Sequence, residues 1–139
     1  ETRNGVISTA RRKPHPDYRS PLHCGSLDIE TTRHGILYCV GLEGCGQRTG
    51  YMLGPANGDD RQMDFELVYV ASRPQLLETL NAWFAEHDPD VIIGWNVVQF
   101  DLRMLQKHAE RYRSPLRLGP AQSELEWRQH VFKNGDFFA

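Results

Sequence analysis

The sequence predicts an α/β fold, in which a mixed sheet carries flanking helices. Three observations predict it: a meander of three β-rich stretches within residues 26–54, a capped helical stretch over residues 72–87, and a buried strand with a second helix after residue 91. Strand, helix, strand and helix after a meander are typical of an α/β layer. The length of 139 residues suits one domain with a sizeable core.

The first 22 residues are expected to be a lead-in segment from a preceding N-terminal domain. They combine prolines with a basic run at residues 11–13, and only the apolar pair at residues 6–7 favours a short edge strand. The basic run is typical of a solvated linker, with a nucleic-acid contact as the alternative. Residues 23–139 are expected to form the domain proper.

Residues 26–54 predict the antiparallel meander. "SLDIE" (26–30), "GILYCVGLE" (35–43) and "QRTGYMLG" (47–54) are rich in strand-forming residues, and the glycines of "GCG" supply the second turn.

The next stretch predicts a strand and a helix. A polar loop (55–64) leads into a short strand in "FELVYVA", after which Ser72 and Gln75 form a capping box with Pro74 in the first turn. Apolar residues then recur at helical spacing until Asp88 and Pro89 stop the helix.

The continuous apolar run "VIIGW" (91–95) predicts a strand covered on both faces. A second helix is expected from about Val98 to Arg113, with Leu102, Leu105, Ala109 and Tyr112 on its inner stripe. The tail after residue 113 is less regular and contains a turn in "KNGDFF".

Composition favours a reduced intracellular compartment, namely the cytoplasm. Cys24, Cys39 and Cys45 are odd in number and have neither a Cys-x-x-Cys pair nor a zinc-like spacing. No apolar run approaches a membrane span, so no membrane partner is expected. The net charge of −2 gives no sign that the chain binds nucleic acid. Bound cations can, however, neutralise phosphate in place of basic residues.

Two carboxylates stand out on the first core strand. Asp28 and Glu30 lie two residues apart, so they share one face of the strand while Leu27 and Ile29 face the other. Like charges at this spacing repel unless a proton or a cation lies between them. The alternative is a strand end that simply exposes both acids to water.

A third acid, Asp101, follows the strand at residues 91–95 in "GWNVVQFD". A right-handed crossover would place that strand parallel to residues 26–30, and the three acids would converge at the carboxyl ends of both strands. Oxygen ligands without nearby Cys or His suit Mg²⁺ or Mn²⁺. A pair of such ions can catalyse the hydrolysis of a phosphodiester by water. The alternative for Asp101 is a carboxylate that stabilises a helix terminus.

These residues carry a family resemblance. "DIET" and "NVVQFD" resemble the Exo I and Exo II motifs of DEDD 3′→5′ exonucleases, which have a ribonuclease H-like fold. "DPDVIIGWNVVQFDLRML" resembles the form these motifs take in family B DNA polymerases. "PHPDY", "LDIETTRHG", "YCVGLEGCGQR" and "YMLGP" are similar to the proofreading domain of the family's bacterial polymerase II branch.

The resemblance implies roles for six residues. Asp28 would bridge two divalent metal ions, Glu30 would bind the ion that activates water, and Asp101 would hold the other ion. The residues implied near the substrate strand are Thr31, Asn96 and Phe100, with plain core packing as the alternative for Phe100.

The resemblance also implies partners: the single-stranded 3′ end of DNA, the rest of the polymerase chain, and a sliding clamp reached through the parent protein. The third motif of such nucleases, Tyr-x-x-x-Asp, is absent from these 139 residues. We therefore expect a C-terminally truncated exonuclease domain that is weakly active or inactive alone. The alternatives are a stand-alone DEDD nuclease and a non-catalytic module that binds metal or DNA.

Overall fold

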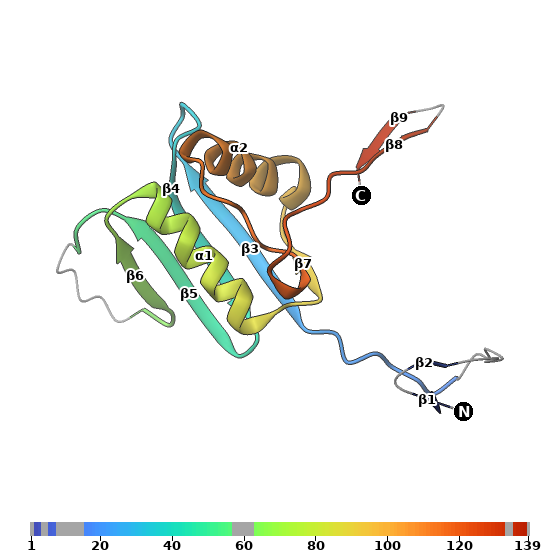
Figure 1. Ribbon diagram of the computed structural model, residues 1–139. Coiled ribbons are helices and arrows are strands. Elements are labelled where there is room, and N and C mark those ends of the chain that lie inside the picture. The colour runs from blue at the N-terminus through green and yellow to red at the C-terminus, as the bar shows by residue number, and fades with distance from the viewer. Residues whose placement is uncertain (1, 4–5, 8–15, 57–62, 133–134, 139) are drawn as a thin grey trace.

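The computed structural model describes residues 2–3, 6–7, 16–56, 63–132 and 135–138 (Figure 1). Its centre is a five-stranded mixed sheet of order β6-β5-β4-β3-β7, with two α-helices on one face. The bounds are β3 (Cys24–Thr31), β4 (Leu37–Gly44), β5 (Gln47–Leu53), β6 (Glu66–Val70), α1 (Arg73–His87), β7 (Val91–Ile93) and α2 (Arg103–Tyr112). The expected α/β fold with a mixed sheet is confirmed.

The meander forms as expected: β3 pairs antiparallel with β4, and β4 with β5. The β4–β5 turn has positive φ at Cys45 (52°) and Gly46 (80°), the backbone that a tight hairpin requires. The residue before this turn, Gly44, has to be a glycine, because a Cβ there would lie 2.4 Å from the carbonyl oxygen of Cys24.

Helix α1 begins at the Ser72 cap that the sequence predicts, but the Gln75 side chain bonds the residue before the cap and not the cap amide itself. The hydroxyl of Ser72 accepts a hydrogen bond from the amide of Gln75 (3.3 Å), and the Gln75 side chain accepts one from the amide of Ala71 (2.9 Å). The helix ends at Asp88, whose left-handed backbone (φ 38°) lets its amide donate to the carbonyl of Phe84.

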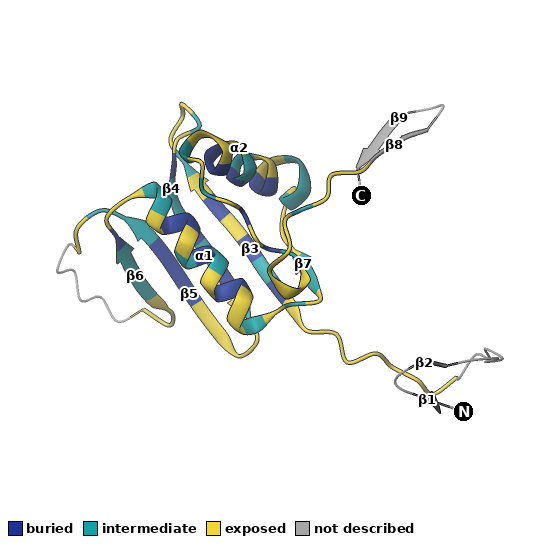
Figure 2. Ribbon diagram, in the orientation of Figure 1, coloured by how far each residue is buried: buried dark blue, intermediate teal, exposed yellow. Residues whose placement is uncertain are grey.

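The core lies between the sheet and the two helices, and the opposite face of the sheet is open (Figure 2). The fully buried side chains of α1 are Leu76, Leu77 and Leu80, and those of the sheet include Leu27 and Leu37. The chain after α2 also enters this core. Its buried residues are Leu116 and Leu118.

Strand β7 differs from the expectation. It runs parallel to β3, as predicted, but it has three residues and forms the edge of the sheet in the described part of the chain. Ile93 is 53 % exposed and Trp95 is 93 % exposed. The expectation of a strand covered on both faces is therefore wrong, because both helices lie on the same face of the sheet.

The second helix begins with a π-helical turn, η1 (Val97–Leu102), which continues into α2. The sequence predicted one helix over about 98–113. Its inner stripe is confirmed for Leu102, Leu105 and Ala109, which are buried, and Tyr112 is half-buried. His108 is buried as well, although the stripe did not include it.

Two small hairpins lie outside the central sheet. Strands β1 (Thr2–Arg3) and β2 (Val6–Ile7) pair with each other, where the sequence predicted one edge strand. Strands β8 (Gln129–Phe132) and β9 (Gly135–Phe138) form the hairpin predicted around "KNGDFF". The basic run at 11–13, most of the polar loop, and the turn residues 133–134 lie outside the described residues.

A short 3₁₀ turn, η2 (Pro120–Gln122), interrupts the segment between α2 and β8. No helix in the described ranges is long and apolar enough to cross a membrane.

Candidate functional site

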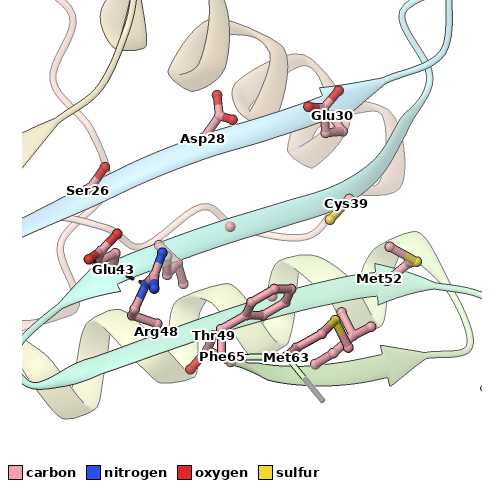
Figure 3. A pocket seen from close by; sticks show the side chains of 14 residues that line it. Ser26, Asp28, Glu30, Cys39, Glu43, Arg48, Thr49, Met52, Met63 and Phe65 are labelled. Atoms are coloured by element: carbon pink, nitrogen blue, oxygen red, sulfur yellow. Dashed lines mark ion pairs between the residues drawn. The ribbon is translucent and has the colours of Figure 1, made fainter. Parts of the chain in front are cut away.

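Asp28 and Glu30 project from β3 on the open face of the sheet (Figure 3). Both residues are exposed, whereas Leu27 and Ile29 between and beside them are buried against the helices. This alternation is the one that the sequence predicts for a strand with one covered face.

The open face is hollowed beside these acids. The hollow has a volume of about 400 Å³, and its walls come from β3, β4, β5 and the start of β6. Its apolar side chains include Met52, Met63, Phe65 and Leu67. Glu30 pairs directly with Cys39 of β4, and burial followed by the charges of Glu30 and Asp28 raises the pKa of the Cys39 thiol. Cys24, Cys39 and Cys45 are all free thiols.

Asp101 reaches β3 from the π-helical turn. Its Oδ1 accepts a hydrogen bond from the amide of Ile29 (3.0 Å), and the residue is only 1 % exposed. Strand β7 stops at Ile93, opposite Ser26, so among the described residues no strand pairs with this edge of β3 further along. Asp101 therefore takes the place of a strand as the acceptor for the Ile29 amide.

The second oxygen of this carboxylate, Oδ2, is buried and has no hydrogen-bond partner. Burial raises the pKa of Asp101 above its usual range, the hydrogen bond from Ile29 opposes this, and the charge of Asp28 adds a smaller increase. The raised pKa thus reflects burial first and repulsion between acids second. The negative charge of Asp28 therefore acts on the carboxylate of Asp101.

The chain between β7 and Asp101 follows a path that Gly94 permits. A Cβ on Gly94 would lie 2.4 Å from the carbonyl oxygen of Leu27, so the backbone passes directly against β3. Asn96 then adopts a left-handed backbone (φ 56°) that starts the π-helical turn. Such turns are often found at functional sites, and here the turn carries Asp101 to the edge of β3.

In the parts of the chain that the structure describes, the three acids do not form a preformed metal-binding site. No group of three or more His, Cys, Asp or Glu side chains in the described part of the chain could hold a metal ion. Convergence of Asp28, Glu30 and Asp101 on shared cations therefore stays a prediction. The donor set still suits a hard divalent cation, because all three are carboxylates and Oδ2 of Asp101 is a buried acceptor without a partner.

The other predicted site residues lie on the elements that carry these acids, namely β3 and the π-helical turn. Thr31 is half-buried at the end of β3, Asn96 is exposed at the start of the π-helical turn, and Phe100 in that turn is 40 % exposed. The exposure of Phe100 argues against plain core packing. Trp95, which the sequence analysis passed over, lies next to Asn96 and is almost fully exposed; its only signal was its place beside the motif.

The fold and the placement of these acids define a class of protein. A five-stranded mixed sheet with two helices, and with acids on a central strand and at the start of the second helix, agrees with a ribonuclease H-like exonuclease domain. Residues 56–133 match the model of the DNA polymerase family B exonuclease domain. The chain belongs to this family, and the resemblance of its motifs is confirmed.

Two related proteins are also DNA polymerases, in agreement with this family. The chain is 79 % identical to DNA polymerase II of Escherichia coli K12 over 136 residues, which is 98 % of this chain and 17 % of that protein. It is 31 % identical to the DNA polymerase of Archaeoglobus fulgidus over 65 residues, covering 47 % of this chain and 8 % of that protein.

A solved structure supports the fold. The family B DNA polymerase of the hyperthermophilic archaeon Pyrobaculum calidifontis matches with a TM-score of 0.59 and 21 % identity, over 84 % of this chain and 14 % of that one. The chain thus spans about a sixth of the length of the bacterial relative that it resembles over almost all its residues.

Proposed function

We propose that this chain is part of the proofreading 3′→5′ exonuclease domain of a larger, cytoplasmic DNA polymerase. The parent would remove the 3′-terminal nucleotide of DNA by hydrolysing its phosphodiester. The family match and the 79 % identity to a polymerase about six times as long as this chain support the proposal. Residues 1–22 would then be a lead-in from a preceding domain, and residues 23–139 would be the exonuclease portion.

The observation that carries the proposal is the state of Asp101. A buried carboxylate with one oxygen held by a backbone amide and the other without a partner is costly for a folded protein. A divalent cation would offset that cost by supplying the missing partner. Asp28, whose charge already acts on Asp101, lies on the strand that Asp101 contacts.

Asp28, Glu30 and Asp101 would hold Mg²⁺ or Mn²⁺. Bound there, two such cations would lower the pKa of the attacking water and stabilise the charge that develops on the phosphate. The residues of this chain would hold the metal-binding carboxylates in a fixed position. The hydrogen bond to Ile29 fixes Asp101, and the strand geometry keeps Asp28 and Glu30 on one face.

The substrate would be a single-stranded 3′ end. Phe100 offers an exposed ring on which a base could stack, while Asn96 and Thr31 offer hydrogen-bonding groups near the acids. The remaining partners in this proposal are the rest of the polymerase chain and, through it, a sliding clamp.

The test uses the complete polymerase that contains this segment. Labelled single-stranded DNA is incubated with the enzyme in Mg²⁺, in Mn²⁺ and in chelator, and shortening from the 3′ end is followed on a gel. We expect metal-dependent shortening that Asp28→Ala abolishes while DNA synthesis by the same enzyme continues. Shortening that survives Asp28→Ala or the chelator would overturn the proposal.

For the separate 139-residue chain, one observation favours a weaker function: its sequence contains no Tyr-x-x-x-Asp motif. Such a chain would bind metal or DNA weakly without cleaving at the parent's rate. The same gel assay on the chain alone distinguishes the two cases.

A further inference from the structure

Buried His108 on α2 contacts the turn that follows the two β3 acids. Its Nε2 lies 3.3 Å from the amide nitrogen of Leu37 and 3.2 Å from the carbonyl oxygen of Gly35. Gly35 lies in the connection between β3 and β4, and Leu37 is the first residue of β4. A neutral imidazole can serve either group through Nε2, as acceptor for the amide or as donor to the carbonyl, depending on its tautomer.

Leu37 marks the point where the β3–β4 ladder becomes irregular. Glu30 pairs with Cys39, but the next residue, Thr31, pairs with Leu37, so one extra residue of β4 bulges out between them. A bulge of this kind changes the direction of the strand and of the side chains beside it. The contact at Leu37 therefore bears on where Glu30 and Thr31 point.

A second helix also contacts Leu37. Arg73, the first residue of α1, donates from Nε to the carbonyl oxygen of Leu37 (2.9 Å). The amide and the carbonyl of one residue are thus approached by side chains from α2 and α1 respectively. This arrangement fixes the bulge against the helix layer.

The same helical segment contacts both β3 and the chain that follows β3. Asp101 accepts from the amide of Ile29, and His108, seven residues later, contacts the turn beyond Glu30. Residues seven apart lie near one face of a helix, so both contacts come from the side that faces the sheet. Along the chain, Glu30 lies between these two contacts, and Asp28 directly precedes the first of them.

We propose that His108 is a positioning residue, which sets the register between Asp101 and the acids Asp28 and Glu30 by holding the β3–β4 turn. This inference rests on the proposed exonuclease function. His108 does not touch the substrate; it acts through the backbone of Leu37 and Gly35. Because two-metal hydrolysis needs its ligands in a fixed relation, a shift of about 1 Å at Glu30 is enough to slow the reaction roughly 100-fold.

The test compares three substitutions in the complete polymerase. His108→Leu keeps the apolar bulk and removes the hydrogen-bonding nitrogen, whereas His108→Gln places an amide near the position of Nε2. His34→Leu, at an exposed histidine in the same turn, is the matched control. If His108→Leu fails to fold, His108→Asn, whose amide is too short to reach Leu37, replaces it.

For His108→Leu we expect the kcat for 3′-end cleavage to fall by roughly 10- to 100-fold, with the KM for single-stranded DNA and the rate of DNA synthesis unchanged. More Mn²⁺ should be needed for half-maximal cleavage. His108→Gln should recover most of the kcat, and His34→Leu should behave like the wild type. Independently of activity, hydrogen exchange at the Leu37 amide should be faster in His108→Leu and near wild type in His108→Gln.

Three results would overturn the inference: an unchanged kcat in His108→Leu, equal losses in the Leu and Gln variants, or a change confined to KM. Absence of cleavage by the wild-type enzyme would instead defeat the proposed function, and the inference with it. The two failures are therefore distinguishable.

Discussion

The carboxylate of Asp101 accepts a hydrogen bond from the backbone amide of Ile29 (3.0 Å), a residue 72 positions earlier in the sequence. This single contact joins the π-helical turn to the strand that carries Asp28 and Glu30. It satisfies a buried amide that β7 is too short to reach. It also leaves the other carboxylate oxygen buried without a partner.

Replacing Asp101 with Asn should stabilise the metal-free chain. The amide oxygen of Asn can still accept from Ile29, and the substitution removes a buried negative charge whose desolvation the protein must otherwise bear. We expect the free energy of unfolding at pH 7.5 in chelator to rise by about 1 kcal/mol. Urea denaturation measures it.

Asp101→Leu is the control for that result. It removes the acceptor as well as the charge, so the buried amide of Ile29 loses its partner and the chain should be destabilised by about 1–3 kcal/mol. Equal destabilisation by the Asn and Leu variants would show that the ionised carboxylate itself stabilises the fold.

His108 should make the stability of the chain depend on pH. Burial lowers the pKa of this histidine below its usual 6.5, and the nearby charges of Arg73 and Arg111 lower it further, against a hydrogen bond with Gly35 that raises it. Below about pH 6.5 the unfolded chain therefore binds a proton that the folded chain resists. The free energy of unfolding should fall as pH decreases below this value.

Urea midpoints between pH 7.5 and pH 5 test this dependence in the wild type and in His108→Gln. The Gln variant should lose part of the decline, whereas His34→Gln, at an exposed position, should retain it. A decline that is identical in all three proteins would mean that other groups cause it.

Much of this fold could be predicted because its signals are local. The cap at Ser72, the stop at Asp88 and the glycines at 44 and 46 act over a few residues, and each formed as predicted. The parallel placement of β7 beside β3 followed from the general handedness of crossovers.

The remaining features depend on tertiary contacts. An apolar run such as "VIIGW" reads the same at the centre and at the edge of a sheet, so the exposure of Trp95 was not predictable from it. Leu116 and Leu118 enter the core because Asn81 of α1 hydrogen-bonds the backbone of residues 115 and 117, a contact without any periodic signal.

For the candidate site, the sequence predicts a set of residues, whose role as metal ligands stays a prediction, and it does not predict their geometry. The motifs predict Asp28, Glu30 and Asp101 as the metal-binding carboxylates. The capping of the Ile29 amide by Asp101 depends on where β7 ends, and a pattern of residue types does not specify that point.

Glu30→Gln should separate catalysis from folding in the complete polymerase. Glu30 is exposed, so the free energy of unfolding should change by no more than about 0.5 kcal/mol. If Glu30 holds a metal ion as proposed, the rate of 3′-end cleavage should fall by at least about 100-fold, since even residues that only support a metal ligand cost about 10- to 100-fold when they are changed. Glu43→Gln, an exposed acid that lines the same hollow, should cleave normally; a comparable loss there would indicate a general effect of charge on this face.

Gly94→Ala should disturb the site through the backbone alone. A Cβ at residue 94 would meet the carbonyl oxygen of Leu27 at 2.4 Å, so the backbone at residue 94 or at β3 must shift to accept it. Since that turn carries Asp101, we expect a destabilisation of about 1–3 kcal/mol and faster hydrogen exchange at the Ile29 amide. Gly41→Ala is the matched control, because its Cβ would lie 3.9 Å from the nearest atom, the carbonyl oxygen of Asp28, at an ordinary contact distance. Protection of the Ile29 amide that is unchanged in Gly94→Ala would mean that Asp101 is held at β3 by something other than the path of the chain between β7 and η1.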